Sequence, residues 1–149
     1  MVCDEGSSET PPNMDRIVVA AKAGADQPWL ADAAAELAKQ TGAAVSVVSM
    51  DGLEVEALSP TPRSEFLKAA EQSVNGFLER LREAGVEADG EPRSGSVTRG
   101  VLMFAEEKDA DVIVTGATTK GRVARRVLGS VPMELISRAR RPVLVITPP

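Results

Sequence analysis

Short apolar runs recur along the chain and alternate with longer segments in which apolar residues appear at helical spacing. The runs predict five strands, at residues 17–21, 45–50, 86–93, 111–115 and 143–146. The run 17–21 is apolar without interruption, which is typical of a central parallel strand that is buried on both faces. The run 86–93 differs because Gly90 and Pro92 interrupt it, and this favours a place at an edge of the sheet.

Four helices are predicted between the strands, over residues 26–41, 63–84, 97–108 and 131–140. Asp26 is the predicted N-cap of the first helix, and Gly42 is its C-terminal stop. Ser130 is the predicted N-cap of the last helix, which starts at Val131 and has Pro132 in its first turn. The stripe of the first helix that should face the sheet consists of Leu30, Ala33, Ala34, Leu37 and Ala38.

This alternation predicts one doubly wound α/β domain over residues 16–149, a parallel sheet with helices on both faces. The strand-helix-strand units predict right-handed crossovers. Residues 1–15 are polar and acidic and contain two adjacent prolines, so they are predicted to form a disordered tail.

The composition narrows the chemistry that the chain can perform. There is no histidine among the 149 residues, which excludes Ser-His-Asp and Cys-His catalytic arrangements and removes the commonest metal ligand. Cys3 is the only cysteine, so neither an intrachain disulfide nor a cysteine cluster for zinc can form. No pair of carboxylates is placed to suggest acid–base catalysis. We therefore expect a protein that is not an enzyme.

The hydrophobic pattern also predicts where in the cell the protein is located. No apolar run approaches the ~18 residues that a membrane-spanning helix needs. The first 15 residues lack the apolar segment of a signal peptide. We expect a cytoplasmic protein that does not associate with membranes.

Positive charge is concentrated near the C-terminus, although the formal net charge of the chain is −5. One interpretation is a solvated helix face. Another is that Arg122, Arg125 and Arg126 share a helix face beside an anion site. Nucleic-acid binding is not expected, because the chain has no recognised motif and few aromatic side chains to stack on bases. The basic residues between 120 and 141, set against the single acid Glu134, are Lys120, Arg122, Arg125, Arg126, Arg138, Arg140 and Arg141.

Two segments that contain glycine predict a site for an anion. Gly116 directly follows a strand, where the backbone is expected to turn sharply without a Cβ in the way. Gly129-Ser130 precedes a helix, whose free N–H groups and positive end attract negative charge. Each segment also has a simpler interpretation, Gly116 as a turn and Gly129-Ser130 as an ordinary helix start.

The spacing Gly116-(two residues)-Thr119-(nine residues)-Gly129-Ser130 resembles the nucleotide loop of the universal stress protein family. Members that bind ATP carry glycine, two residues, glycine, nine residues, and then Gly-Ser or Gly-Thr. The resemblance extends to the first strand and helix and to the last strand, and so covers residues 15–147. It implies an adenine nucleotide alpha hydrolase-like fold, three layers α/β/α around a five-stranded parallel sheet in the order 3-2-1-4-5. In that order a ligand binds at the carboxyl ends of strands 1 and 4, where the topology switches.

The resemblance also implies a site for ATP or another adenine nucleotide, and it allows for Mg²⁺ bound with the nucleotide. In ATP-binding members an aspartate follows the first strand, whereas this chain has Lys22, whose ammonium group cannot accept a hydrogen bond. Thr119 replaces a motif glycine, and a left-handed conformation there would cost on the order of 1–2 kcal/mol. The implied binding residues are Ala21, Lys22, Met50, Thr115, Gly116, Thr119, Lys120, Gly129, Ser130 and Val131.

The function implied by the resemblance is a stress-response module whose nucleotide state is read out through a homodimer. Family members commonly dimerise through the final strand, and the apolar edge segment Val143–Ile146 is expected to do so here. The alternative is a family member that binds no nucleotide and acts as a dimeric interaction protein. The sequence leaves open whether the protein hydrolyses ATP slowly.

Overall fold

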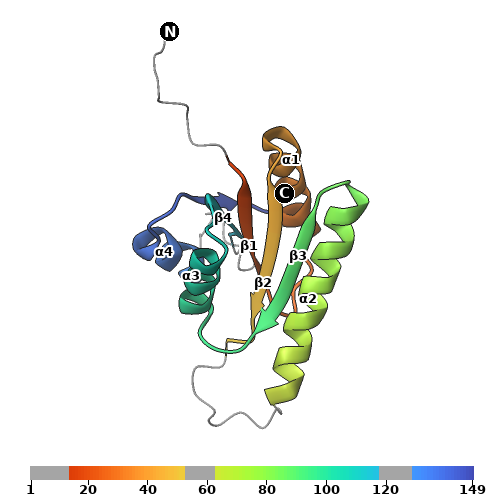
Figure 1. The fold of residues 1–149 in the computed structure, drawn as a ribbon. Coiled ribbons are helices and arrows are strands. Elements are labelled where there is room, and N and C mark those ends of the chain that lie inside the picture. Colours follow the sequence, from red (N-terminus) through yellow and green to blue (C-terminus); the bar gives the residue numbers. More distant parts are fainter. Residues whose placement is uncertain (1–13, 53–62, 118–128) are drawn as a thin grey trace.

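The computed structural model describes residues 14–52, 63–117 and 129–149. Its five strands are all parallel and lie in the order β3-β2-β1-β4-β5, as predicted (Figure 1). The elements in chain order are β1 (Arg16–Lys22), α1 (Pro28–Thr41), β2 (Ala44–Met50), α2 (Arg63–Glu83), β3 (Ala88–Arg93), α3 (Val97–Glu107), β4 (Val112–Gly116), α4 (Ser130–Arg138) and β5 (Val143–Ile146).

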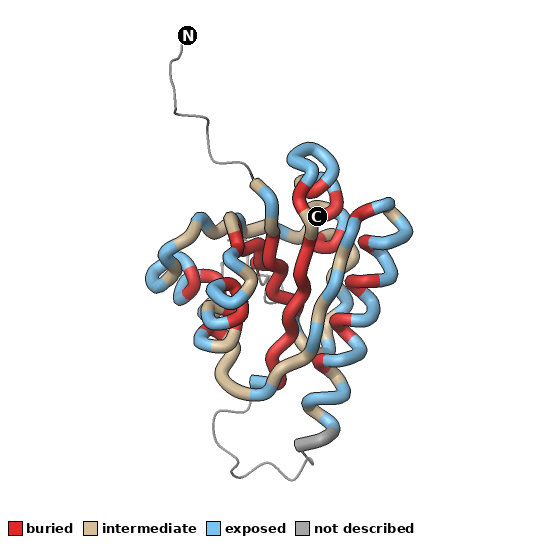
Figure 2. The backbone as a smooth tube through the Cα atoms, in the orientation of Figure 1, coloured by how far each residue is buried: buried red, intermediate tan, exposed pale blue. Residues whose placement is uncertain are grey.

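Two apolar cores lie on the two faces of the sheet. On one face Ile17 and Val19 pack with residues of α1 and α2, and on the other Val18 packs with residues of α3 and α4. Successive residues of a strand point to opposite faces, so a strand buried on both sides is largely apolar, although β2 also buries Ser46 and Ser49. In Figure 2 the central strands are buried along most of their length, whereas the helices around them carry buried, intermediate and exposed residues. The three-layer fold is therefore confirmed.

The two edge strands lie where they were predicted, β3 from its own sequence and β5 from the family resemblance. β3 carries Gly90 and Pro92 and alternates between partly buried and exposed residues. β5 lies at the opposite edge and pairs with β4 from Ile113↔Val143 to Gly116↔Ile146. None of the helices in the described ranges is both long enough and apolar enough to cross a membrane.

Both predicted N-caps are wrong by one residue. In α1 the N-cap is Gln27 and not Asp26, because the Gln27 carbonyl accepts the N–H groups of Leu30 and Ala31 and the helix proper starts at Pro28. In α4 the N-cap is Gly129, and Ser130 is the first helical residue, with no hydrogen bond from a cap side chain. Pro28 has no N–H to satisfy, which suits the first position of a helix.

The buried face of α1 also differs from the predicted stripe. Ala33 and Leu37 are only partly buried, and two alanines on the other side of the stripe are buried instead. The helix is rich in alanine, so its sequence marks no single apolar face, and the position of α2 decides which residues are covered. The buried residues are Leu30, Ala31, Ala34, Ala35 and Ala38.

In α3 the largest buried side chain is Phe104, whereas Val97 and Leu102 are only partly buried. At the start of the domain Met14 packs against the core that α1 and α2 cover, and the Asp15 N–H donates to Asp111 Oδ2 over 2.7 Å. The rest of the predicted tail, residues 1–13, lies outside the described part of the chain.

Candidate functional site

A cavity of about 940 Å³, called the crevice below, opens at the carboxyl edge of the sheet. It lies where β1 and β4 end side by side, with Ala20 paired to Thr115 and Lys22 paired to Met50. This is the switch point between neighbouring strands that leave the sheet toward opposite faces. Its lining residues are Ala20, Ala21, Lys22, Ala23, Gln27, Met50, Asp51, Val97, Thr115, Gly116, Ala117, Gly129, Ser130, Val131, Pro132 and Met133.

The structure brings together every predicted binding residue that it describes. Thr119 and Lys120 lie outside the described residues, as do Arg122, Arg125 and Arg126. The predicted residues found on the crevice wall are Ala21, Lys22, Met50, Thr115, Gly116, Gly129, Ser130 and Val131.

The start of α4 offers backbone donors to the crevice. The first N–H groups of a helix have no acceptor within the helix, and here they belong to Ser130 and Val131, because Pro132 has none. Gly129 turns the chain into the helix with φ 95° and ψ 162°, a conformation that is essentially restricted to glycine. The two N–H groups and the positive end of the helix together favour an anion at this wall.

Gly116 has a different role from the predicted turn. It is the last residue of β4, paired with Ile146, and its φ is not in the left-handed region. A Cβ built on Gly116 would lie 2.6 Å from Cη2 of Trp29 and 3.1 Å from Nε2 of Gln27. Glycine is therefore required because the start of α1 approaches the end of β4 closely, and the conformation of the backbone is not the reason.

Met50 lines the crevice but is held beneath α3. It is buried, and a Cβ built on Gly100 of α3 would overlap its Sδ and Cε atoms. The thioether therefore packs into the space that Gly100 leaves. A methionine in this position presents a soft apolar surface on which a flat ring can lie.

The crevice wall also contains residues that were not predicted from the sequence, among them Gln27, Asp51 and Val97. The Lys22 N–H donates to Gln27 Oε1 over 3.0 Å. Asp51 directly follows β2, and its Oδ1 accepts the Gly95 N–H over 2.9 Å. Asp51 could have been singled out as an acid at the carboxyl end of a central strand, but nothing in the sequence distinguishes Gln27.

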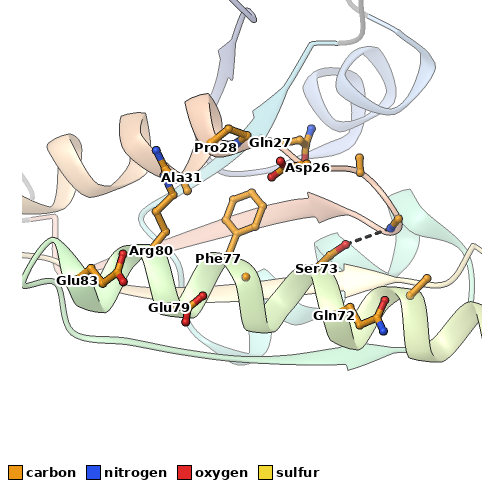
Figure 3. Close-up of a pocket in the computed structure, with 14 residues that line it drawn as sticks. Asp26, Gln27, Pro28, Ala31, Gln72, Ser73, Phe77, Glu79, Arg80 and Glu83 are labelled. Carbon is orange, nitrogen blue, oxygen red and sulfur yellow. Dashed lines mark hydrogen bonds between the residues drawn. The ribbon is translucent and has the colours of Figure 1, made fainter.

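A second, smaller cavity of about 440 Å³, called the groove, lies between α1 and α2 (Figure 3). It shares the loop 23–27 with the crevice, and Gln27 lines both cavities. Ser73 of α2 holds this loop, because its Oγ accepts the Gly24 N–H over 3.1 Å and donates to the Lys22 carbonyl over 3.2 Å. A contact from α2 therefore fixes the segment that carries Lys22.

Arg80 on the groove wall forms an ion pair with Asp32 of α1, which is not itself a lining residue. Arg80 makes two hydrogen bonds to Asp32, from Nε to Oδ1 over 2.8 Å and from Nη2 to Oδ2 over 3.2 Å. The hydrogen bond from Arg80 lowers the pKa of Asp32, and the same contact raises the pKa of the Arg80 guanidinium. Both side chains are largely exposed, so the pair is screened by water.

Within the described ranges no three Asp, Glu, His or Cys side chains gather in a way that could hold a metal ion. The crevice wall carries one acid, Asp51, which already accepts the Gly95 N–H. These residues do not form a protein cage for Mg²⁺. Mg²⁺ is instead commonly bound through nucleotide phosphates and water.

Comparisons with known proteins agree with this architecture. The model of the universal stress protein family matches residues 13–147. Universal stress protein MJ0531 of Methanocaldococcus jannaschii is 38% identical over 87 residues, which are 58% of this chain and 51% of that protein, so the match spans about half of the relative's length.

Two solved structures of universal stress proteins from Archaeoglobus fulgidus are each 26% identical to this chain. One has a TM-score of 0.73 and is covered over 98% of its length by 89% of this chain. The other, a complex with dAMP, has a TM-score of 0.68 and is covered over 99% of its length by 91% of this chain. The chain therefore belongs to the universal stress protein family.

Proposed function

We propose that the protein is a nucleotide-responsive stress protein that binds an adenine nucleotide in the crevice, with the phosphates at the start of α4. The observation that carries this proposal is the position of the Ser130 and Val131 N–H groups. They lie on one wall of a cavity that is otherwise lined largely by apolar residues, at the carboxyl ends of β1 and β4. A cavity with a few polar groups at one end suits a ligand with an apolar ring and an anionic group.

The size of the crevice and the ligand of a relative support the same proposal. Its volume of about 940 Å³ lies within the range that cavities for small molecules and cofactors occupy. The universal stress protein of Archaeoglobus fulgidus in complex with dAMP shares the fold and family of this chain. Met50 and Val97 supply the apolar surface for the base. Any Mg²⁺ would enter with the nucleotide, since the described residues do not form a site for it alone.

Nucleotide binding is tested by extracting purified protein and analysing the extract by mass spectrometry, and by titrating nucleotide-free protein with AMP and ATP, with and without Mg²⁺. Trp29 is the only tryptophan, the chain has no tyrosine, and the indole ring stands against Gly116, so its fluorescence reports on the crevice. We expect saturable changes in fluorescence and in calorimetric heat. If neither nucleotide binds at millimolar concentration, the alternative of a dimeric interaction protein takes the place of this proposal.

We further propose that the nucleotide state is read out through a homodimer formed at β5. This strand is an edge of the sheet, and its Leu144 is 40% exposed. An exposed edge strand with apolar side chains is prone to pair with another strand. Light scattering with and without AMP tests the proposal, and Leu144→Lys should convert a dimer to a monomer. A parent protein that is monomeric at micromolar concentration in both states would contradict it.

A further inference from the structure

The orientation of the Gln27 carboxamide is determined by the backbone. The Lys22 main-chain nitrogen donates to the side-chain atom of Gln27 that lies 3.0 Å away, so that atom must be the oxygen Oε1. The amide group Nε2 therefore occupies the opposite branch of the carboxamide. It lies beside Gly116, at 3.1 Å from the position that a Cβ on Gly116 would take.

The Nε2 group has hydrogens to donate. Among the described residues no hydrogen bond runs from Gln27 Nε2 to a protein acceptor, and Gln27 lines the crevice. A carboxamide carries two N–H donors on this atom. The oxygen is used within the protein, so the group acts toward the crevice as a donor only.

The donor is also held in place. Gln27 is the N-cap of α1, and its carbonyl accepts two helical N–H groups. The loop before it is tied down by Ser73, which bonds to Gly24 and to Lys22, and by the Ala25 N–H, which donates to the Lys22 carbonyl over 3.2 Å. A donor fixed before the ligand arrives loses little conformational entropy when it binds.

We infer that Gln27 is a specificity-determining residue of the crevice, whose Nε2 donates a hydrogen bond to an acceptor of the nucleoside, either a ring nitrogen or a ribose oxygen. This inference rests on the proposed nucleotide binding. Gln27 belongs to the start of α1, on one face of the sheet, whereas Ser130 and Val131 belong to α4, on the other face. A nucleotide that has its phosphates at α4 and spans the crevice brings its nucleoside to the wall that carries Gln27. The Lys22 ammonium group is likewise a donor only, so this wall selects acceptors.

The test is Gln27→Glu. Glutamate keeps an oxygen to accept the Lys22 N–H and replaces only the donor, so the loop retains its internal hydrogen bond. Calorimetric titrations use AMP and the uncharged nucleoside adenosine, for which repulsion of phosphate by the new carboxylate cannot contribute. We expect both ligands to bind roughly tenfold more weakly, because one hydrogen bond is lost and a carboxylate oxygen of Glu then faces an acceptor of the nucleoside.

The matched control is Gln72→Glu, the same change of charge on α2, at the wall of the groove and not of the crevice. It should leave both affinities unchanged. The inference is overturned if Gln27→Glu binds as tightly as the parent, or if Gln72→Glu loses as much, while the proposed function stands in either case. If the parent itself binds neither ligand at millimolar concentration, the proposed function fails as well. Circular dichroism and thermal unfolding verify that both variants fold.

Discussion

The crevice and the groove share the loop 23–27, yet their polar groups are arranged differently. In the groove Arg80 pairs with Asp32, and Ser73 bonds to the backbone of the loop, so these groups satisfy one another. In the crevice the N–H groups at the start of α4 have no acceptor within their helix, and Gln27 Nε2 donates to no described protein group. Buried or half-buried donors cost free energy unless they find a partner. Polar groups that pair internally hold the fold together, whereas those left facing a cavity are available to a ligand.

The largest expected effect comes from the turn that presents the α4 donors. Gly129→Ala places a Cβ at φ 95°, so the turn must change and the Ser130 and Val131 N–H groups must move. We expect AMP affinity to fall by about tenfold or more. Gly42→Ala, at φ 78° in the C-cap of α1, is the control for backbone strain away from the crevice. Equal AMP affinity in Gly129→Ala and the parent would show that the helix start is not the phosphate site.

Ser73→Ala tests the wall that the two cavities share. It removes the acceptor of the Gly24 N–H and a donor to the Lys22 carbonyl, so the free energy of unfolding should fall by about 1–2 kcal/mol in urea. AMP should also bind more weakly, because the loop that carries Lys22 and Gln27 is less ordered. Ser137→Ala is the control, since Ser137 is exposed and its Oγ donates to the Met133 carbonyl of the same helix. A loss of stability with unchanged AMP affinity would mean that the two cavities are independent.

Gly76→Ala changes the groove alone. Gly76 lies inside α2, and a Cβ built on it meets no atom within 4 Å. Alanine should raise the free energy of unfolding by roughly 0.5–1 kcal/mol, because it has the higher helix propensity. AMP affinity should not change. Gly90→Ala should instead destabilise the protein, because its Cβ would lie 2.6 Å from the Val47 carbonyl oxygen.

The smallest effect concerns the ion pair beside the groove. The pKa of Asp32 is lowered in the folded protein from its usual value of 3.8. The pair therefore contributes stability that is present above pH ~3.8 and is lost as the pH falls through the lowered pKa. Urea unfolding of the parent and of Asp32→Asn across this range should show a smaller loss of stability on acidification in the variant. Identical pH profiles for the parent and Asp32→Asn would show that water screens the pair completely.

The strands follow from local features of the sequence, whereas their order was predicted from the resemblance to the universal stress protein family. The central strands are mostly apolar, although β2 contains Ser46 and Ser49, and the edge strand β3 differs from them through Gly90 and Pro92. The helix faces were harder to predict. In α1 the succession of alanines marks no single stripe, so the packing of α2 decides that Ala31 and Ala35 are buried and that Ala33 is not.

The sequence identified the glycines of the candidate site, but the reason predicted for a glycine at position 116 was wrong. Gly129 was predicted beside a helix start, and its φ of 95° agrees with a requirement for glycine. Gly116 was predicted to form a turn, but it is needed because Trp29 and Gln27, which lie almost ninety positions earlier in the chain, stand where a Cβ would be. No motif around residue 116 carries that information.

The sequence by itself determined the alternation of strands and helices through its apolar periodicity, and the resemblance of its glycine spacing to a known family implied the strand order and the segments that meet at the carboxyl ends of β1 and β4. Only the tertiary structure decided which polar groups face the crevice. Gln27 looks like any polar residue before a helix. It becomes a donor aimed at the crevice because the Lys22 N–H binds its oxygen, Ser73 of α2 holds the loop, and Gly116 leaves room beside it. These contacts join segments that lie far apart in the chain, and they exist only once the helices have packed on the sheet.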